Sequence, residues 1–373
     1  MRILICPDKF RGTISAAGAA GAIAEALAAH ADEVVVKPLA DGGEGTLDAF
    51  GGSNRASVVT GPLGDPVKAR WRISDAIAVI EMAEASGLTL AGGSAHNDPL
   101  AATSYGTGEL ITEARLAGAH RIIVAVGGSA STDGGLGALR AMEPVVRFAG
   151  IDVEVACDVS TKFLDAPSVF GPQKGASPAQ IRMLEGRLSS LAGLYKAEYG
   201  RDVTQLPRSG AAGGLAGGLA AVGARLTNGF DLVAEENELE EAVANSDLVI
   251  TGEGRLDSES FNGKVVGGVL SISARCGVPS VAVVGDQDPD LKVPAGLEVL
   301  SLVEIYGSDR AFEDTARCLN GLKKCSETTY EPFEGLISSS PCAYKHQIRH
   351  NFEAGGRIMS SEVANMGPSL IGC

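Results

Sequence analysis

The sequence predicts an α/β protein: a doubly wound parallel sheet with a second, mixed α/β domain inserted into it. One observation is the opening β-α-β unit, with a buried-type strand over Arg2–Cys6, a helix from Ser15 to about His30 and a strand over Glu33–Leu39. The other is that strands alternate with helices again after about residue 240. Short connections join three strand-like runs between these parts, which indicates an antiparallel meander.

The remaining elements follow in order from apolar patterns and turn signals. The meander strands are Arg55–Thr60, Val67–Ile73 and Ile77–Met82. Four helices are predicted next or later, over Thr107–Ala117, 178–194, 210–224 and Lys264–Arg275. The other predicted strands are Arg121–Val126, Val153–Cys157, Asp247–Thr251, Val278–Val284 and Leu297–Leu302. We therefore expect one discontinuous domain at 1–53 and 240–319, and an inserted domain at 54–239.

The composition changes after about Leu319, where alanine and glycine become rare and the periodicity weakens. We interpret 320–373 as an atypical tail that adds little to the core, so truncation after Asn320 is expected to preserve the fold. The competing interpretation is that the tail covers one face of the parallel sheet.

Charge and apolar content exclude several classes of protein. The net charge is −15 and no basic cluster occurs, which argues against binding to nucleic acid or to anionic membranes. No run approaches the roughly 20 apolar residues of a membrane span. Residues 1–8 have the pattern of a strand and not of a signal peptide. Seven cysteines without a Cys-x-x-Cys spacing indicate reduced thiols, so we expect a cytoplasmic protein, and a homodimer stays open.

Four short segments combine glycines with charged residues, and several of them follow a β-branched apolar run: Pro38–Thr46, Gly127–Gly135, Phe170–Ala176 and Thr251–Asp257. Glycine permits tight turns and close approach to a ligand. Neighbouring carboxylates can hold a divalent cation or accept a proton. The segments therefore predict a polar cleft for a phosphorylated, metal-bound small molecule.

Asp41 and Glu44 flank a glycine pair at the predicted end of a strand. One interpretation makes Asp41 a general base or a metal ligand. The other makes the pair a variant capping box, with Asp41 as the N-cap of a helix. Asp8 and Glu253 are also predicted to lie just beyond strand ends, where doubly wound sheets bind their ligands.

The segment Gly127–Gly135 follows a predicted strand and precedes a predicted helix. Its backbone amides and the hydroxyls of Ser129, Ser131 and Thr132 can cradle an anion, while Asp133 can hold a metal. It lacks the Gly-Lys-Ser/Thr ending of a Walker A loop, and a ligand-free tight turn is the alternative. Asp158 also follows a strand, either as a second metal ligand or as a turn residue.

Few positive charges accompany these segments. Lys174 lies in a stiff Gly-Pro-Gln-Lys-Gly loop, and Lys9 and Arg11 are the cations nearest to Asp8 in the chain. Arg255 can bind a carboxylate or a phosphate through two nitrogens, or it can pair with Asp257 within its own loop.

Taken together, these segments resemble the glycerate kinase type-1 family of bacteria. The resemblance also includes Cys6–Thr13, Ile80–Ala83, Ser104–Ile111 and Ala156–Val159, in the same order along the chain. It implies ATP-dependent phosphorylation of D-glycerate, usually at the 2-hydroxyl, with magnesium. It also implies that the doubly wound domain is flavodoxin-like and carries an inserted mixed domain.

Our hypothesis for the individual roles goes beyond the resemblance. Asp41 is the general base, with Asp8 as its substitute, and Lys174 neutralises charge during transfer. Lys9 and Arg255, beside Glu44 and Asp257, bind glycerate. The nucleotide is assigned to six residues: Gly127, Gly128, Ser129, Ser131, Thr132 and Glu253. Asp133 and Asp158 are assigned to Mg²⁺.

Three alternatives stay open at this stage. The link between Met142 and Asp152 is a few dozen residues shorter than is typical of the family, and the run Ser160–Leu164 departs from the family pattern. These departures suggest the alternative that the protein is a catalytically impaired remnant of the family that binds nucleotide or another anion. A metal-dependent phosphoester hydrolase would use the same carboxylates. The product of a kinase is 2- or 3-phosphoglycerate, depending on how the substrate lies relative to the base.

Overall fold

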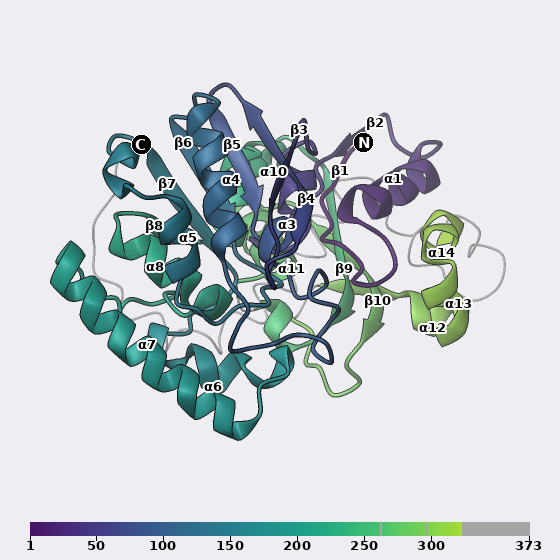
Figure 1. The fold of residues 1–373 in the computed structure, drawn as a ribbon. Helices are drawn as coiled ribbons and strands as arrows, with labels where there is room; N and C mark the ends of the chain where they lie inside the picture. The colour runs from purple at the N-terminus through teal and green to yellow at the C-terminus, as the bar shows by residue number, and fades with distance from the viewer. Residues whose placement is uncertain (262, 295–296, 323–373) are drawn as a thin grey trace, which may run out of the picture.

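The computed structural model describes residues 1–261, 263–294 and 297–322, and its strands form two sheets (Figure 1). In this part of the chain the first sheet has five parallel strands in the order β11-β10-β9-β1-β2. Their bounds are β1 (Arg2–Ile5), β2 (Glu33–Val36), β9 (Leu248–Leu256), β10 (Ser280–Gln287) and β11 (Glu298–Ser301). Numbered along the chain, this order is the 2-1-3-4-5 order of flavodoxin-like sheets, which confirms the predicted fold class.

Apolar residues alternate between the two faces of the first sheet. On β1, Ile3 and Ile5 pack on one face, and Leu4 packs on the other. The first face is covered by α1 (Ala16–Leu27), with α12 (Leu302–Tyr306), α13 (Ser308–Glu313) and α14 (Thr315–Gly321) near it. The second face is covered by α9 (Gly229–Glu236), α10 (Leu239–Ala244) and α11 (Val265–Cys276). Helices thus cover both faces of the sheet, as is usual for parallel sheets, while the edge strand β2 stays partly exposed.

The second sheet has the order β3-β4-β5-β6-β7-β8 within the described residues. Its strands are β3 (Arg55–Thr60), β4 (Pro66–Ser74), β5 (Ile77–Glu81), β6 (Arg121–Ala125), β7 (Asp152–Cys157) and β8 (Arg225–Asn228). The predicted meander is confirmed, because β4 pairs antiparallel with both of its neighbours. From β5 to β8 all neighbouring strands are parallel, so their carboxyl ends lie at one edge.

Helices from the same stretch of chain cover one face of the second sheet. They are α3 (Ala83–Ser86), α4 (Tyr105–Leu116), α5 (Leu136–Ala141), α6 (Ala166–Phe170), α7 (Pro178–Tyr199) and α8 (Leu215–Ala221). The longest, α7, begins with a capping box between Ser177 and Gln180 and ends before Gly200, whose φ of 71° suits glycine. This helix forms the lower left border of the view in Figure 1.

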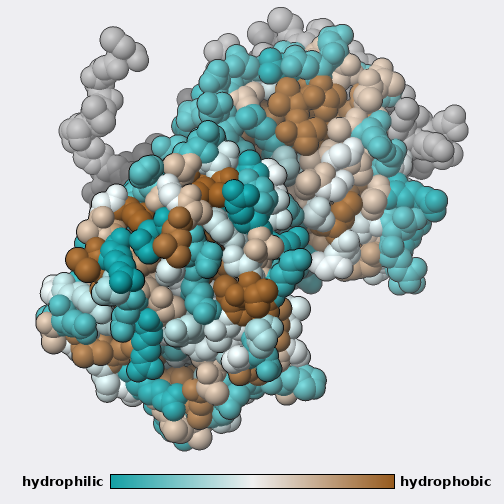
Figure 2. All heavy atoms as spheres, turned by 45° about the horizontal axis from the view of Figure 1, so that its top comes forward, coloured by the Kyte–Doolittle hydropathy of each residue, from teal (hydrophilic) through white to brown (hydrophobic). Residues whose placement is uncertain are grey.

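The two sheets meet through a small apolar cluster on the other face of the second sheet. Leu47 of α2 (Thr46–Ala49) and Leu232 of α9 pack against Val79, Ile123 and Ala156. Because α9 also packs against the first sheet through Phe230 and Val233, it contacts both sheets. Figure 2 shows the resulting two lobes, whose hydrophobic patches are separated by hydrophilic surface.

Several predicted element limits are wrong; the helix predicted over 178–194, for example, continues to Tyr199. The strand predicted over Glu33–Leu39 ends at Val36, and the strand predicted to end at Thr251 continues to Leu256. The helix predicted over 210–224 is a short 3₁₀ turn followed by α8, because Ala212 and Gly213 have positive φ angles that interrupt a helix. The domain limits 1–53, 54–239 and 240–319 stay a prediction; strands of the first sheet fall in 2–36 and 248–301, and those of the second in 55–228.

The predicted start of the tail needs a correction. Cys318, Leu319 and Leu322 are buried in the cluster that joins α14 to α1, so a truncation after Asn320 would remove the core residue Leu322. Residues 323–373, which make up the rest of the predicted tail, lie outside the described residues. Among the described helices, none combines the length and apolar character needed to cross a bilayer.

Candidate active site

The site begins where the strand order of the first sheet reverses, between β1 and β9. Ligands of doubly wound sheets bind outside the carboxyl ends of the strands at such a point. Asp8 follows β1, and its backbone N–H donates to the carbonyl of Gly252 at 2.8 Å. Glu253 lies inside β9 and not after it as predicted, but β9 extends past the end of β1 here. Asp8 and Glu253 therefore lie at the same sheet edge.

The loop that carries Asp41 leaves the first sheet and lies against the carboxyl end of the second. A Cβ on Gly127, just after β6, would lie 2.6 Å from Cα of Gly43. A Cβ on Gly42, where φ is 90°, would lie 2.7 Å from Cα of Gly229 and 3.1 Å from the backbone of Ala156. Side chains do not fit at these approaches, which explains why this segment needs glycine.

The carboxylate of Glu81, at the end of β5, holds the same loop in place. One oxygen accepts the N–H of Gly45 at 3.0 Å and the N–H of Leu47 at 2.6 Å. Burial raises the pKa of Glu81 to about 7, while these two donors act in the opposite direction. Glu81 was not predicted as a site residue, although the motif Ile80–Ala83 contains it. Its partner is distant in sequence, so no local signal identified this role.

The capping interpretation of Asp41 is wrong. Helix α2 begins at Thr46 with Gly45 as its N-cap, and the side chain of Asp41 accepts only a long hydrogen bond, 3.3 Å, from N–H of Gly43. Asp41 is partly exposed. Its carboxylate is thus open to a ligand between the two lobes.

Asp41 acts electrostatically on two further carboxylates, Asp8 and Asp158, and Asp8 acts on a third, Glu253. Burial raises the pKa of Asp8, and the charge of Asp41 raises it further, while Lys9 lowers it. Burial, then Asp41, raises the pKa of Asp158 to about 6. Burial raises the pKa of Glu253 to about 7, with a contribution from Asp8. Asp8, Asp41, Asp158 and Glu253 come from four separate segments of the chain, and pairs of them are close enough to influence each other's pKa values.

Two lysines offset this negative charge. Lys9 donates from Nζ to the carbonyl of Glu44 at 2.6 Å. Lys264, at the N-cap of α11, lowers the pKa of Asp8, Asp158 and Glu253, so its ammonium acts on three of the four carboxylates. Lys264 was missed by sequence reasoning. Its signal is a glycine and a lysine directly before a helix that follows the segment Thr251–Asp257.

The other predicted substrate residues have different surroundings. Arg255 is exposed within β9, and no ion pair joins it to Asp257, both of which the structure describes. Asp257 accepts N–H groups of Glu259 and Ser260 and so caps the next turn. Glu44 is exposed, and it lines, with Lys9 and Arg11, a cavity of about 340 Å³ between the loops that follow β1 and β2.

The predicted anion loop is held from behind by Lys174. This lysine is buried, and its Nζ donates to Oγ of Ser129 at 2.7 Å and to the carbonyl of Ser131 at 2.6 Å. Burial lowers its pKa to about 7. In contrast, Oγ of Ser131 and Oγ1 of Thr132 are buried without a hydrogen-bond partner. Buried hydroxyls without a partner are uncommon, and an anionic ligand would satisfy them.

Asp133 and Asp158, both predicted to bind Mg²⁺, have different surroundings. The carboxylate of Asp133 accepts five hydrogen bonds, from groups at the starts of α4 and α5: Oγ1 of Thr103, N and Oγ of Ser104, N of Gly135 and N of Gly137. Metal binding there would break this network. Asp158 instead neighbours Asp41, Lys9 and Lys264. The geometry thus favours a structural role for Asp133.

The acidic residues around Asp41 fit magnesium only when a phosphate completes its coordination. The described residues contain no group of three or more side chains arranged as a ready metal cage. Magnesium usually binds through one or two carboxylates together with substrate phosphates and water. Asp8 and Asp158 have the required oxygen donors and raised pKa values that a cation would reverse.

The buried carboxylate of Glu253 makes stability depend on pH. Its pKa rises from an ordinary 4.5 to about 7 on folding, so the folded protein binds more protons between these values. This part of the free energy of unfolding is therefore present below pH 4.5 and is lost as the pH rises to about 7. The side chain of Glu253→Gln stays neutral at every pH. We therefore expect the melting temperature of this variant, relative to that of the wild type, to increase from pH 5 to pH 8. The exposed Glu313→Gln is the control; an equal, pH-independent difference for both variants would contradict the assignment.

Comparisons with known proteins agree with this picture. The model of the Glycerate kinase family matches residues 3–149 and 142–329. Glycerate 2-kinase of Escherichia coli is 39% identical over 333 residues, which cover 79% of this chain and 87% of that enzyme. Glycerate kinase of Bacillus subtilis is 38% identical over 330 residues, covering 78% and 86%. A crystal structure of a Salmonella typhimurium protein described as a glycerate kinase 2 matches with a TM-score of 0.73 and 35% identity, over 87% of this chain and 97% of that one.

The same comparisons locate a segment that relatives have and this chain lacks. The two ranges matched by the family model overlap at 142–149, within the link that is short for the family. The alignment with the Escherichia coli enzyme is 333 residues long but uses 79% of the 373 residues here, which also indicates a missing segment.

Proposed function

The chain belongs to the glycerate kinase family, and is thus a kinase; we propose that it transfers the γ-phosphoryl group of ATP to the 2-hydroxyl of D-glycerate. The observation that carries this proposal is the position of Asp41. Its carboxylate is partly exposed, acts electrostatically on Asp8, Asp158 and Lys264, and belongs to a loop that contacts Gly127 at the start of the anion loop. A base and an anion-binding loop in contact are what phosphoryl transfer to an alcohol requires.

In the proposed mechanism the residues position the reactants and balance their charge. Asp41 accepts the proton of the attacking hydroxyl, and Asp8 is the alternative base. Lys9 and Arg11 line the cavity of about 340 Å³ beside several carboxylates, and we assign the carboxylate of a three-carbon acid to these two cations. Lys264, among the carboxylates, stabilises negative charge on the transferred group.

On the nucleotide side, the segment from Gly127 to Thr132 binds phosphate. Support comes from the unpartnered hydroxyls of Ser131 and Thr132 and from the glycine backbone before them. Lys174 holds the loop by donating hydrogen bonds to Oγ of Ser129 and to the carbonyl of Ser131. It therefore acts mainly by positioning this loop, a smaller role than direct contact with the phosphate.

Magnesium fits beside Asp158 and Asp8, and we leave Asp133 out of the metal site because five hydrogen bonds occupy its carboxylate. When bound with ATP, the metal would neutralise phosphate oxygens. Among the described cysteines, Cys6, Cys157, Cys276 and Cys318 are free, which suits the cytoplasm that we propose as the location.

A coupled assay of ADP release tests this function. We expect turnover that needs ATP, Mg²⁺ and D-glycerate together, and phosphorus NMR of the product should show 2-phosphoglycerate. A 3-phosphoglycerate signal would revise the position of the substrate only. Phosphate release that does not depend on glycerate would instead indicate a hydrolase. A folded protein without any glycerate-dependent turnover would contradict the proposed function.

The second candidate function is that of a catalytically impaired family member that binds nucleotide without turnover. The short link between Met142 and Asp152 suggested it. The link, however, precedes β7, whereas Asp158 follows the opposite end of that strand, and six residues of strand separate them by about 20 Å. The altered run Ser160–Leu164 is ordered, with Phe163 fully buried. These positions favour an intact site. Binding of ATP with magnesium in calorimetry, without turnover, would favour the remnant.

A further inference from the structure

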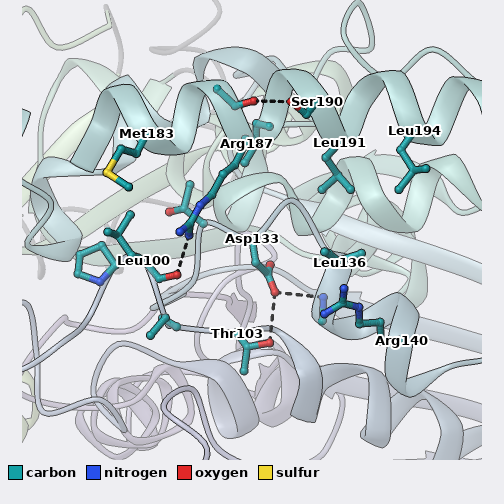
Figure 3. Close-up of a pocket in the computed structure, with 17 residues that line it drawn as sticks. Leu100, Thr103, Asp133, Leu136, Arg140, Met183, Arg187, Ser190, Leu191 and Leu194 are labelled. Carbon is teal, nitrogen blue, oxygen red and sulfur yellow. Dashed lines mark hydrogen bonds between the residues drawn. The ribbon is translucent and has the colours of Figure 1, made fainter. Parts of the chain in front are cut away.

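A second, larger cavity lies on the inserted domain and has no role in the function as described so far. It measures about 820 Å³ and lies between α7 and the segment 99–103, with Thr132 and Asp133 on its wall (Figure 3). This volume is within the range of small-molecule sites in proteins. Its position at the end of the anion loop makes it relevant to the nucleotide.

The walls of the cavity are mostly apolar. Leu191 and Leu194 from α7 face Leu100 and Leu136 on the opposite side in Figure 3. Leu194 is 49% exposed, although it is an aliphatic residue on a long surface helix. Exposed apolar side chains that gather around a hollow are typical of a ligand site.

Polar groups are few and lie at defined positions. Arg187 donates from Nη1 to the carbonyl of Leu100 at 2.8 Å, which joins the two walls. Arg140 lines the opposite side. Thr132 belongs to both the cavity and the anion loop, and its Oγ1 is buried without a partner. The cavity thus combines an apolar surface with cations and an unsatisfied hydroxyl.

The anion loop connects this cavity to the proposed base. It starts at Gly127, which contacts Gly43 two residues after Asp41, and reaches the cavity at Thr132. Five residue steps span at most about 18 Å, a length that an extended nucleoside triphosphate can follow. A ligand whose phosphates follow this loop toward Asp41 would place its other end in the cavity.

We propose that this cavity binds the nucleoside of ATP, with the base against the leucines of α7 and the phosphates directed along the loop toward Gly127. The proposal rests on the proposed kinase function. A three-carbon acid or a free phosphate would leave the apolar wall unused, whereas a nucleobase has a flat apolar face and a polar edge. Thr132, with its free Oγ1, lies where base, sugar and phosphates would join.

Glycines of α7 allow a matched test. Gly186 lines the cavity, and a Cβ there would meet no atom within 4 Å; the same open space surrounds Gly193, seven residues later and outside the lining. Phenylalanine at either position improves helix propensity, so neither variant should unfold. We expect the side chain of Gly186→Phe to occupy the place of the nucleobase and to raise the KM for ATP about 10- to 100-fold, which is the affinity that burial of one ring usually contributes. The KM for glycerate should stay unchanged. Gly193→Phe should behave as the wild type.

Calorimetry separates this inference from the kinase function itself. Wild-type protein should bind ADP more tightly than tripolyphosphate, and Gly186→Phe should lose that advantage while its affinity for tripolyphosphate stays the same. This readout needs no turnover, so it works even if glycerate is not the substrate. An unchanged ATP KM and ADP affinity in Gly186→Phe, at an unchanged melting temperature, would overturn the proposal. Equal losses in Gly186→Phe and Gly193→Phe would also overturn it.

Discussion

Asp41→Asn is expected to lower kcat by about 10²- to 10⁴-fold, the usual range when a general base is lost. Asparagine keeps an oxygen that can accept the N–H of Gly43, so the loop should hold its shape. The carboxylate does not cap α2, and the melting temperature should therefore hardly change. The KM values for both substrates should change much less than kcat, because the proton is accepted only during transfer.

Two controls make this result specific. Asp8→Asn, tested in parallel, shows whether the neighbouring carboxylate is the base, since burial and Asp41 both keep its pKa high. Asp133→Asn should instead lower the melting temperature, because five hydrogen bonds end on that carboxylate. Near-normal turnover in Asp41→Asn would retire the assignment and transfer the role to Asp8.

Lys264→Met is expected to lower kcat/KM by about 10²- to 10³-fold, the typical cost of losing one preorganised charge at the transferred group. The same substitution removes the cation that lowers the pKa of Asp8, Asp158 and Glu253. Their pKa values should rise, so the acidic limb of the pH profile should move to higher pH. The measurement is kcat/KM between pH 5 and pH 9.

The chain offers a matched control for Lys264. Its Nζ lies 3.3 Å from a carboxylate oxygen of Glu259, so Glu259→Gln removes the ion pair and keeps the ammonium. That variant should retain nearly full activity, and Lys264→Arg should recover part of it. Equal losses in Lys264→Met and Glu259→Gln would mean that the lysine only stabilises the start of α11.

The spacing of apolar residues along the sequence predicted the core of the fold, because the residues that make this spacing are the ones buried in the structure. The alternation of Ile3, Leu4 and Ile5 between two faces, for example, follows directly from the pleat of a strand. The limits of α8 were wrong because glycine and alanine permit both a helix and a left-handed turn, and packing against other loops decides between them. Single-sequence patterns do not contain that packing.

Part of the candidate site could also be expected from the sequence. Asp158 directly follows β7, Asp8 lies just after β1, Asp41 lies in the loop after β2, and Glu253 lies near the carboxyl end of β9. Strand direction therefore takes all four toward carboxyl ends of strands. Glu81 was missed because the loop that it holds is distant in sequence. Lys264 was missed because Asp8 and Asp158, on which it acts, are also distant in sequence. Asp133 looked equivalent to Asp158 in sequence, yet the starts of two helices occupy its oxygens.

The attachment of the Asp41 loop at both of its ends limits how the protein can move. Leu39 and Ala40 are fully buried against the first sheet, and Glu81 of the second sheet binds the N–H groups of Gly45 and Leu47. The two ends of the loop are thus held by different sheets, and only the short segment 41–44 lies between them. We therefore expect the proposed base to be in position before substrate arrives, unlike in kinases that assemble their site by closing around the ligand. Selection among small hydroxy acids would then depend on how each one fits a preformed cleft, and a slow closing step should not limit turnover.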